Sequence, residues 1–478
     1  MNHALASLPL ALAAGGGRLD DHDATALVAA GIALLQRCAP LTRALVGRRA
    51  ALLAPTGAPF LVGLAACEGR GAVLINPLAA PAEVAHQCAD ADVGAVFTVA
   101  ALAPRVPAGL PIVLLDEAPR RARVHLDDRT LDVDLGSHVG LALEGDTEEP
   151  GSDEEAVVVY TSAMAGTPLG AILTHRNLLA NARGTIDAAR LTAADHCLAV
   201  LPFSHLFGLT VTLAAPLLAG ARTTTMPRFH PLKALDLLER AGVTMLVGVP
   251  AVFVALLAAI ERRGGVRPDA LRVAICGGAP LDPGIQTRWE AATGVPLRQG
   301  YGLTEASPVC LFNHVDAPNR IGTLGTAYPG CDVSIRDPRT SAPLPAGTSG
   351  EICVAGDTVG PGYVRGGDAG LRRVAGWLHT GDRGRMDADG VVRFEGLVKP
   401  MFTRNGFNIY PTELERTIAL LDGVRTVAVT GVPDALKEHE IAVAVTGDTT
   451  EAAVRAWCEA LLSAYKQPGT ITIAPADA

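Results

Sequence analysis

The sequence predicts an α/β fold, because short apolar runs alternate with helix-like stretches over most of the chain. Such alternation is typical of parallel sheets that are covered by helices. After about Gly325 the pattern changes to short strands separated by Gly and Pro, which indicates a small, mostly antiparallel β-subdomain. A separate α/β unit begins near Leu397. We therefore expect a domain boundary at about Lys399, with domains 1–398 and 399–478.

The expected strands of the large domain are short and strongly apolar. They comprise Ala50–Leu53, Ala72–Ile75, Ala95–Thr98, Ala156–Tyr160, Cys197–Leu201, Met245–Val249 and Val273–Cys276. The β-subdomain is expected to contain Asp332–Ile335, Gly350–Val354 and Val391–Glu395. The last unit is expected to hold helices at Pro411–Leu421 and Thr450–Ala464, and strands at Val424–Thr430 and Ile441–Thr446.

Composition excludes several classes of function. The chain has 478 residues and a formal net charge of −9, so it lacks the basic field that nucleic-acid binding needs. Its nine cysteines include no CxxC pair, which argues against a zinc or redox site and favours a reducing cytoplasm. We expect no metal site and no membrane span. The apolar run Gly242–Ile260 approaches spanning length, but Pro250 divides it into a buried strand and a helix.

A small-residue loop follows the apolar run Val157–Val159. The loop spans Tyr160–Gly170, and a helix is expected to begin near His175. A strand, a small-residue loop and a helix form the usual layout of an anion-binding turn, in which backbone amides point at the anion.

This loop resembles the phosphate-binding signature YTSG-[ST]-[ST]-G-x-P-K-G of the adenylate-forming superfamily, which includes the acyl-CoA synthetases and AMP-dependent ligases. The match holds at Tyr160, Thr161, Ser162, Gly166, Pro168 and Gly170. It departs where the hydroxyls and the lysine should lie, at Ala163, Met164, Ala165 and Leu169. Each lost charge-assisted contact to ATP costs roughly 1.5–3 kcal/mol. A variant loop could still bind ATP through Mg²⁺ and backbone amides.

The resemblance covers nearly the whole chain, and it implies two helix-flanked sheets in the large domain and a mobile small C-terminal domain. Leu201–Gly208 matches a segment whose histidine or aromatic residue lines the acyl pocket. Ile275–Pro280 matches a glycine turn beside the adenine and the acyl group, and Gln299–Glu305 matches GYG-x-TE. Thr380–Asp382 matches the TGD stretch. The acyl-pocket residues implied are Phe203, Phe207, Val249, Cys276, Gly277, Gly278, Ala279, Tyr301 and Gly302.

The resemblance also implies roles for individual residues. Tyr301 would stack on adenine, Thr304 would contact phosphate and carboxylate, and Glu305 would hold Mg²⁺. Asp382 and Lys399 would contact the nucleotide of CoA or a vestigial AMP. The hinge arginine that contacts ribose is replaced by Leu397. The C-terminal domain ends at Ala478, before the position of the family's catalytic lysine.

The segment Asn405–Glu415 closely resembles the loop beside the pantetheine tunnel of CoA-forming members, with Asn405, Gly406 and Phe407 at the tunnel. The glycine would let a thin thiol arm pass the backbone. The same segment would also begin a helix at Pro411, and the two roles are compatible.

The positions that depart from the family motifs are those that would contact ATP. The positions that match them are those of the acyl pocket and the thiol tunnel. We therefore predict a cytoplasmic acyltransferase that moves an acyl group from acyl-CoA to the phosphopantetheine thiol of an acyl carrier protein without ATP, as in a polyketide or fatty-acid-like pathway. Thr304 would polarise the thioester carbonyl and His205 would act as a base or as a pocket wall. Cys276 and Cys310 would be acyl carriers or buried inert thiols.

Two alternatives remain open. The first is an ATP-dependent acyl-CoA ligase with a variant phosphate loop, for which ATP and Mg²⁺ would be required. The second is a non-catalytic protein that binds acyl-CoA or a carrier domain.

Overall fold

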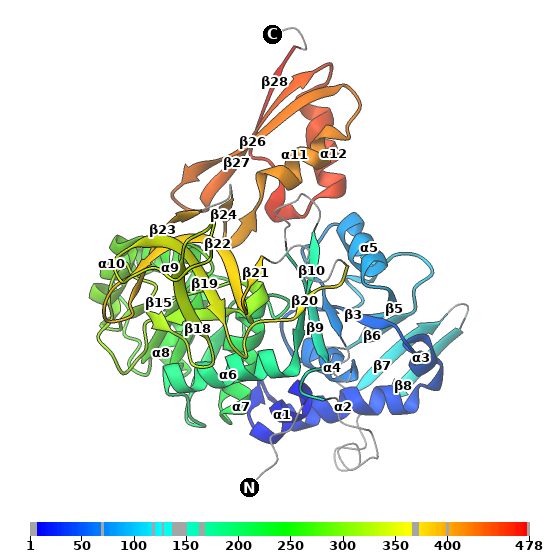
Figure 1. The fold of residues 1–478 in the computed structure, drawn as a ribbon. Helices are drawn as coiled ribbons and strands as arrows, with labels where there is room; N and C mark the ends of the chain where they lie inside the picture. Colours follow the sequence, from blue (N-terminus) through cyan, green and yellow to red (C-terminus); the bar gives the residue numbers. More distant parts are fainter. Residues whose placement is uncertain are drawn as a thin grey trace.

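The computed structural model describes residues 7–67, 71–116, 120–126, 129–135, 151–161, 168–365, 372–397 and 401–475. A large N-terminal domain of sheets and helices carries a smaller C-terminal domain, drawn in orange and red in Figure 1. The α/β fold predicted from the sequence is therefore confirmed. The expected boundary residue Lys399 lies outside the described ranges, so its exact position stays a prediction.

The first large sheet is parallel in its centre and antiparallel at its ends. Its strands, in spatial order, are β17 (Thr326–Ala327), β16 (Val309–Phe312), β15 (Leu297–Gly302), β14 (Val273–Cys276), β13 (Met245–Gly248), β11 (His196–Ala199), β12 (Arg222–Thr225), β1 (Arg18–Leu19) and β2 (His22–Asp23). The run Gly242–Ile260 divides as expected into β13 and the helix α9 (Pro250–Arg263). In the described part of the chain, no helix is both long and apolar enough to span a bilayer.

The second large sheet has the same mixed character. Its spatial order is β20 (Gly362–Tyr363), β10 (Leu169–Thr174), β9 (Glu155–Thr161), β4 (Ala72–Leu74), β3 (Arg49–Leu53), β5 (Val93–Thr98), β6 (Ile112–Leu115), β7 (Arg121–Leu126) and β8 (Arg129–Asp134). One expectation is corrected here. The phosphate loop does not lead directly into a helix, because β10 pairs antiparallel with β9 before α6 (His175–Ala189) begins.

Helices occupy three layers around these sheets. Those packed between the sheets, where the largest core cluster lies, include α1 (Leu8–Gly15), α2 (Ala24–Arg37), α4 (Ala58–Ala66), α6 and α7 (Ala215–Leu218). The outer face of the first sheet is covered by α8 (Pro231–Arg240), α9 and α10 (Pro283–Thr293). The second sheet is covered by α5 (Pro81–Asp90), while α3 (Ala39–Ala44) lies beside β5 and β7. A π-helical segment, Phe207–Ala214, follows β11.

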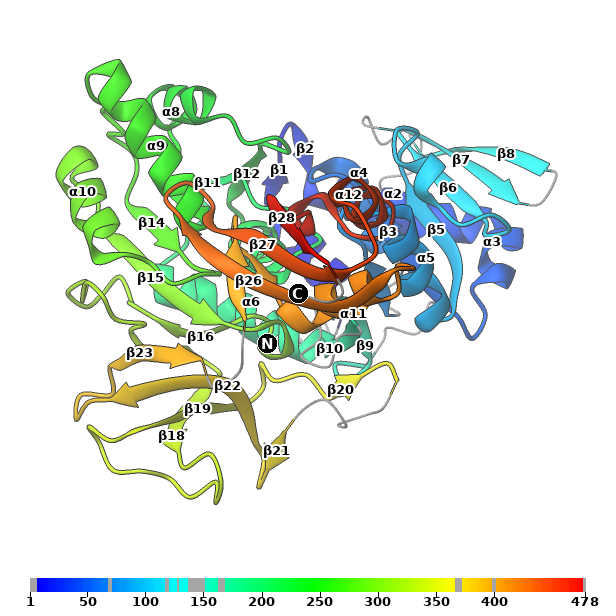
Figure 2. The same cartoon turned by 90° about the horizontal axis from the view of Figure 1, so that it is seen from above.

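The β-subdomain and the C-terminal domain follow the expected order. The subdomain sheet comprises β18 (Asp332–Arg336), β19 (Ser349–Ala355), β22 (Trp377–Met386), β21 (Arg373–Val374) and β23 (Val392–Leu397). The C-terminal domain contains the hairpin β24 (Phe402–Arg404) and β25 (Phe407–Ile409), and then α11 (Pro411–Ala419), β26 (Val424–Asp434), β27 (Glu438–Gly447), α12 (Glu451–Leu461) and β28 (Thr470–Ala474). Figure 2 shows this domain lying over the space between the two large sheets.

A buried lysine connects the two domains. Lys466, which is 3% exposed, places its Nζ 2.6 Å from Glu413 Oε1 in the same domain and 3.0 Å from Glu83 Oε1 on α5 of the large domain. The Ser463 hydroxyl also hydrogen-bonds to Glu83. Because two carboxylates surround one buried ammonium, removing the ammonium would leave buried negative charges without compensation.

We expect Lys466→Met to destabilise the docked C-terminal domain by about 3–5 kcal/mol, the usual cost of removing one partner from a buried ion pair. Calorimetric unfolding measures this change. Lys233→Met on α8 is the control, because Lys233 is exposed. Equal unfolding profiles for the two variants would contradict the importance of this contact.

Candidate active site

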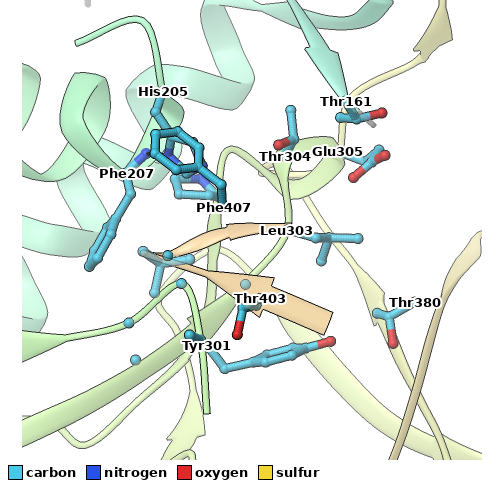
Figure 3. Close-up of a pocket in the computed structure, with 18 of the residues that line it drawn as sticks. Thr161, His205, Phe207, Tyr301, Leu303, Thr304, Glu305, Thr380, Thr403 and Phe407 are labelled. Atoms are coloured by element: carbon cyan, nitrogen blue, oxygen red, sulfur yellow. Dashed lines mark hydrogen bonds between the residues drawn. The ribbon is translucent and has the colours of Figure 1, made fainter. Parts of the chain in front are cut away.

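A cavity of about 1020 Å³ lies where the carboxyl ends of β14 and β15 meet the C-terminal domain. Ligand sites of parallel α/β sheets are usually found at this edge. Figure 3 shows that Tyr301, Thr304 and Glu305 from the large domain gather here with Thr403 and Phe407 from the C-terminal hairpin. The cavity is thus built from both domains.

Most of the predicted site residues line this cavity. They are His205, Phe207, Gly277, Gly278, Ala279, Tyr301, Gly302, Thr304, Glu305, Asp382, Gly406 and Phe407. Their functional roles remain predictions. Ala163, Met164, Ala165 and Lys399, on which the interpretation of the nucleotide site partly depended, lie outside the described residues.

Four other predicted residues do not line the cavity. Phe203 is fully buried and packs edge-on against Phe60, with ring centroids 5.6 Å apart. Cys276 is fully buried at the end of β14, and burial raises its thiol pKa well above the usual value. Both side chains belong to the core instead of the cavity lining, and for Cys276 this follows from the alternation of side chains along β14. Val249 and Asn405 lie beside the cavity, at the domain contact that includes Gly406.

The contact between Gly406 and Val249 is too close for a side chain. Gly406 has φ +78°, and a Cβ atom there would lie 2.4 Å from Val249 Cγ1. Next to it, Phe407 stacks on Tyr465 with centroids 4.2 Å apart and an interplanar angle of 19°. The hairpin predicted to border a pantetheine tunnel therefore lies directly against the large domain.

His205 lines the cavity, and a backbone contact fixes the tautomer of its neutral ring. Its Nδ1 accepts the backbone N–H of Phe207 at 3.2 Å, so the proton of the neutral ring is on Nε2. Burial lowers the pKa of His205 to about 4. With its proton on Nε2, its Nδ1 occupied by the Phe207 N–H and its pKa lowered by burial, the ring is a poor proton acceptor at neutral pH. This geometry opposes the expectation that His205 acts as a base.

Tyr301 and Asp382 form a short contact across two sheets. The Tyr301 hydroxyl donates to Asp382 Oδ2 at 2.6 Å. Burial raises the pKa of Asp382 to about 6, although the hydrogen bond from Tyr301 acts in the opposite direction. Both residues line the cavity, so a ligand with hydroxyl groups would meet a carboxylate that is already oriented.

Glu305 is held in a similar way. Its Oε1 accepts the Tyr363 hydroxyl at 2.7 Å, and burial raises its pKa. Thr304 precedes it in a single turn, Thr304–Ala306, that follows β15. A carboxylate oxygen is a ligand type that Mg²⁺ accepts, and the role of Glu305 toward Mg²⁺ stays a prediction.

The permanent cations among the described lining residues of the cavity are already paired. Among the lining residues that the structure describes, Arg372 and Lys466 are the permanent cations. Arg372 lies 3.3 Å from Glu351, and Lys466 contacts Glu83 and Glu413. Leu169 and Leu397 occupy the places where the resemblance predicts cations, and both line the cavity.

The structure adds a lining residue that sequence reasoning missed. His439 on β27 faces the cavity, and its Nδ1 lies 3.0 Å from the Thr403 carbonyl oxygen. No motif surrounds this histidine in the sequence, and only the docking of the C-terminal domain brings it to the site.

We expect Asp382→Asn to stabilise the protein increasingly as pH rises from about 4 to 6. The native carboxyl has a raised pKa and binds more protons than the unfolded one in this window, so it reduces stability as pH rises. Above pH 6 the free energy of unfolding of the variant should exceed that of the wild type by about 1–2 kcal/mol, after allowing for the partial exposure of Asp382. Urea unfolding at pH 5 and pH 8 measures it, and Asp389→Asn, which is exposed, should show no such pH dependence.

Curated relatives match most of the chain. A feruloyl-CoA synthase from Amycolatopsis sp is 32% identical over 444 residues, which cover 89% of this chain and 84% of that protein. A sulfoacetate–CoA ligase from Cupriavidus necator is 33% identical over 439 residues, covering 88% and 83%. Both are named for the joining of an acid to CoA.

Solved structures share the fold. A malonyl-CoA ligase in a ternary product complex with methylmalonyl-CoA and AMP has a TM-score of 0.81, with 24% identity and 96% coverage of each chain. ATP-bound MatB from Rhodopseudomonas palustris has a TM-score of 0.68, with 28% identity and coverage of 98% and 95%. The family model described as AMP-binding enzyme matches residues 39–364, and the AMP-binding enzyme C-terminal domain matches residues 413–477. This chain belongs to the AMP-binding enzyme family.

Proposed function

We propose that this enzyme transfers an acyl group from an acyl-CoA to the phosphopantetheine thiol of an acyl carrier protein without using ATP, in the cytoplasm. The observation that carries the proposal is the charge of the cavity. A triphosphate needs several cationic partners, and both permanent cations among the described lining residues are paired with carboxylates. Within residues 162–167, which lie outside the described ranges, the sequence contains neither Lys nor Arg.

The energetics of the reaction support the same function. Exchange of one thioester for another conserves the type of bond, so the acyl transfer itself requires no coupled hydrolysis. The acceptor sulfur forms a bond to the acyl carbon, the bond from that carbon to the CoA sulfur breaks, and CoA leaves as a thiol. The proton lost by the acceptor thiol balances the one gained by CoA.

Residues of the cavity suit both the acyl group and the pantetheine arm of the acceptor. Phe207 and Val211 contribute apolar lining, which favours an apolar acyl group. The Thr304 hydroxyl and the Nε2–H of His205 are donors for a developing oxyanion on the acyl carbonyl. Phe407 and Gly406 supply the side from which a pantetheine arm would approach.

An ATP-dependent acid–thiol ligase is the second candidate, and the relatives favour it. Feruloyl-CoA synthase and sulfoacetate–CoA ligase share about a third of their aligned residues with this chain. Tyr301, Glu305 and Asp382, to which the family resemblance assigns a nucleotide and its Mg²⁺, also line the cavity, which supports this candidate. The two candidates differ in one property, which is whether the cavity binds MgATP productively.

Two parallel assays separate the candidates. In the first, purified protein receives acyl-CoA donors, such as benzoyl-CoA and octanoyl-CoA, with pantetheine as acceptor and no ATP. In the second, it receives the free acids with ATP, Mg²⁺ and CoA. Acyl-pantetheine formation in the first assay supports transfer. Pyrophosphate release in the second, without activity in the first, overturns transfer in favour of the ligase. Binding of acyl-CoA without activity in either assay supports the non-catalytic alternative.

We expect Leu169→Lys to increase MgATP affinity by about 10- to 100-fold, because one charge-assisted contact contributes roughly 1.5–3 kcal/mol. Leu169 lines the cavity at the start of β10, where a lysine could reach a bound phosphate. Titration calorimetry measures the change. Val46→Lys is the control, because Val46 is 74% exposed outside the cavity. Equal MgATP affinity in the two variants would show that the absence of a positive charge at residue 169 does not limit nucleotide binding.

A further inference from the structure

Two of the three described histidines that line the cavity, His205 and His439, are held in opposite tautomers. At His205 the partner of Nδ1 is a backbone N–H, which can only donate, so Nδ1 has no proton. At His439 the partner of Nδ1 is the Thr403 carbonyl oxygen, which can only accept, so Nδ1 carries the proton. The neutral His439 ring therefore has its lone pair on Nε2, whereas the neutral His205 ring has its proton there.

His439 is held firmly by its neighbours. It lies on β27, opposite Pro433 of β26, and its ring centroid is 5.6 Å from that of Phe402 on β24. The hydrogen bond to the Thr403 carbonyl fixes the orientation of the ring. These contacts keep the tautomer and the ring direction before any substrate arrives, as a positioned base requires.

The charged groups around His439 have other partners. Glu438, the preceding residue, has φ +69°, and its Oε2 accepts the Gly406 N–H at 3.1 Å. Glu440, the following residue, contacts Arg404 at 2.8 Å and also pairs with Lys437.

On β26, Asp434 accepts the backbone N–H groups of Leu436 and Lys437. Burial raises the pKa of Glu438, although the Gly406 amide acts in the opposite direction. None of these groups forms a hydrogen bond with His439 Nε2 in the described part of the chain.

We propose that His439 Nε2 is the general base that removes the proton from the attacking pantetheine thiol, while His205 Nε2–H donates a hydrogen bond to the acyl carbonyl oxygen. The proposal rests on the proposed function, because it assumes that a thiol attacks an acyl carbon in this cavity. The proton passes to Nε2, the thiolate sulfur bonds to the acyl carbon, and the donor C–S bond breaks. The imidazolium then returns the proton to the departing CoA sulfur.

A thiol needs such a base at neutral pH. Its ordinary pKa is about 8.5, so only a few per cent is thiolate at pH 7. General base catalysis contributes on the order of 10²–10⁴ in rate. The same need exists when a thiol attacks an acyl adenylate, so His439 would serve either candidate function.

The test is His439→Gln, with pantetheine as acceptor and benzoyl-CoA as donor. We expect kcat at pH 7 to fall about 100-fold or more, while the KM for the donor changes little. The loss should shrink as pH rises toward 9, because the thiol then ionises without help. Added imidazole should partly restore the rate of His439→Ala. His125→Gln, outside the cavity lining, is the matched control and should behave as wild type.

The possible failures can be told apart. An active wild type with an equally active His439→Gln variant would overturn the base assignment and leave the function standing. An inactive wild type in both assays would refute the proposed function. In that case ¹⁵N spectra of histidine-labelled protein test the inference alone, and they should show the Nδ1–H tautomer for His439 and the Nε2–H tautomer for His205. The reverse pair of tautomers would overturn it.

Discussion

The buried contact of Lys466 with Glu83 and Glu413 is the constraint on which the site depends, because it fixes the C-terminal domain against α5. An ammonium that is almost completely removed from water needs compensating carboxylates, and one of its two partners belongs to the other domain. The same docking places Phe407 and His439 at the cavity edge. The charge cluster therefore helps to hold together a cavity that is lined from both domains.

The electrostatics of the cavity connect this constraint to function. Lys466 contributes to the lining, but its charge is already used to join the domains, and the charge of Arg372 is used by Glu351. Three lining carboxylates, on Glu83, Glu305 and Asp382, add negative charge. The absence of an unpaired permanent cation among the described lining residues is the basis of the proposed transfer between thioesters.

Much of the fold was predictable from local pattern. The division of Gly242–Ile260 at Pro250 follows from the fixed φ of proline and from the length of the apolar run, and β13 and α9 confirm it. The strand β10 was missed because Leu169–Thr174 is short and its first two residues belong to the segment that resembles a phosphate loop. Its strand character depends on pairing with β9 and β20, which is a tertiary property. The strand β26 extends beyond the expected Thr430 to Asp434 because its partner β27 begins at Glu438.

The sequence alone determined the family resemblance and identified a set of residues most of which line the cavity, since glycine turns and the GYG-x-TE segment are local patterns. Only the tertiary structure decided the tautomer of His439 and the pairing of the cations, whereas the partner of His205 is local, the N–H of Phe207 two residues along the chain. The reason is that the other partners lie far apart in the chain: Thr403 with His439, Tyr301 with Asp382, and Glu83 with Lys466. A hydrogen bond assigns a proton to one ring nitrogen only when the fold brings a donor or an acceptor to the other.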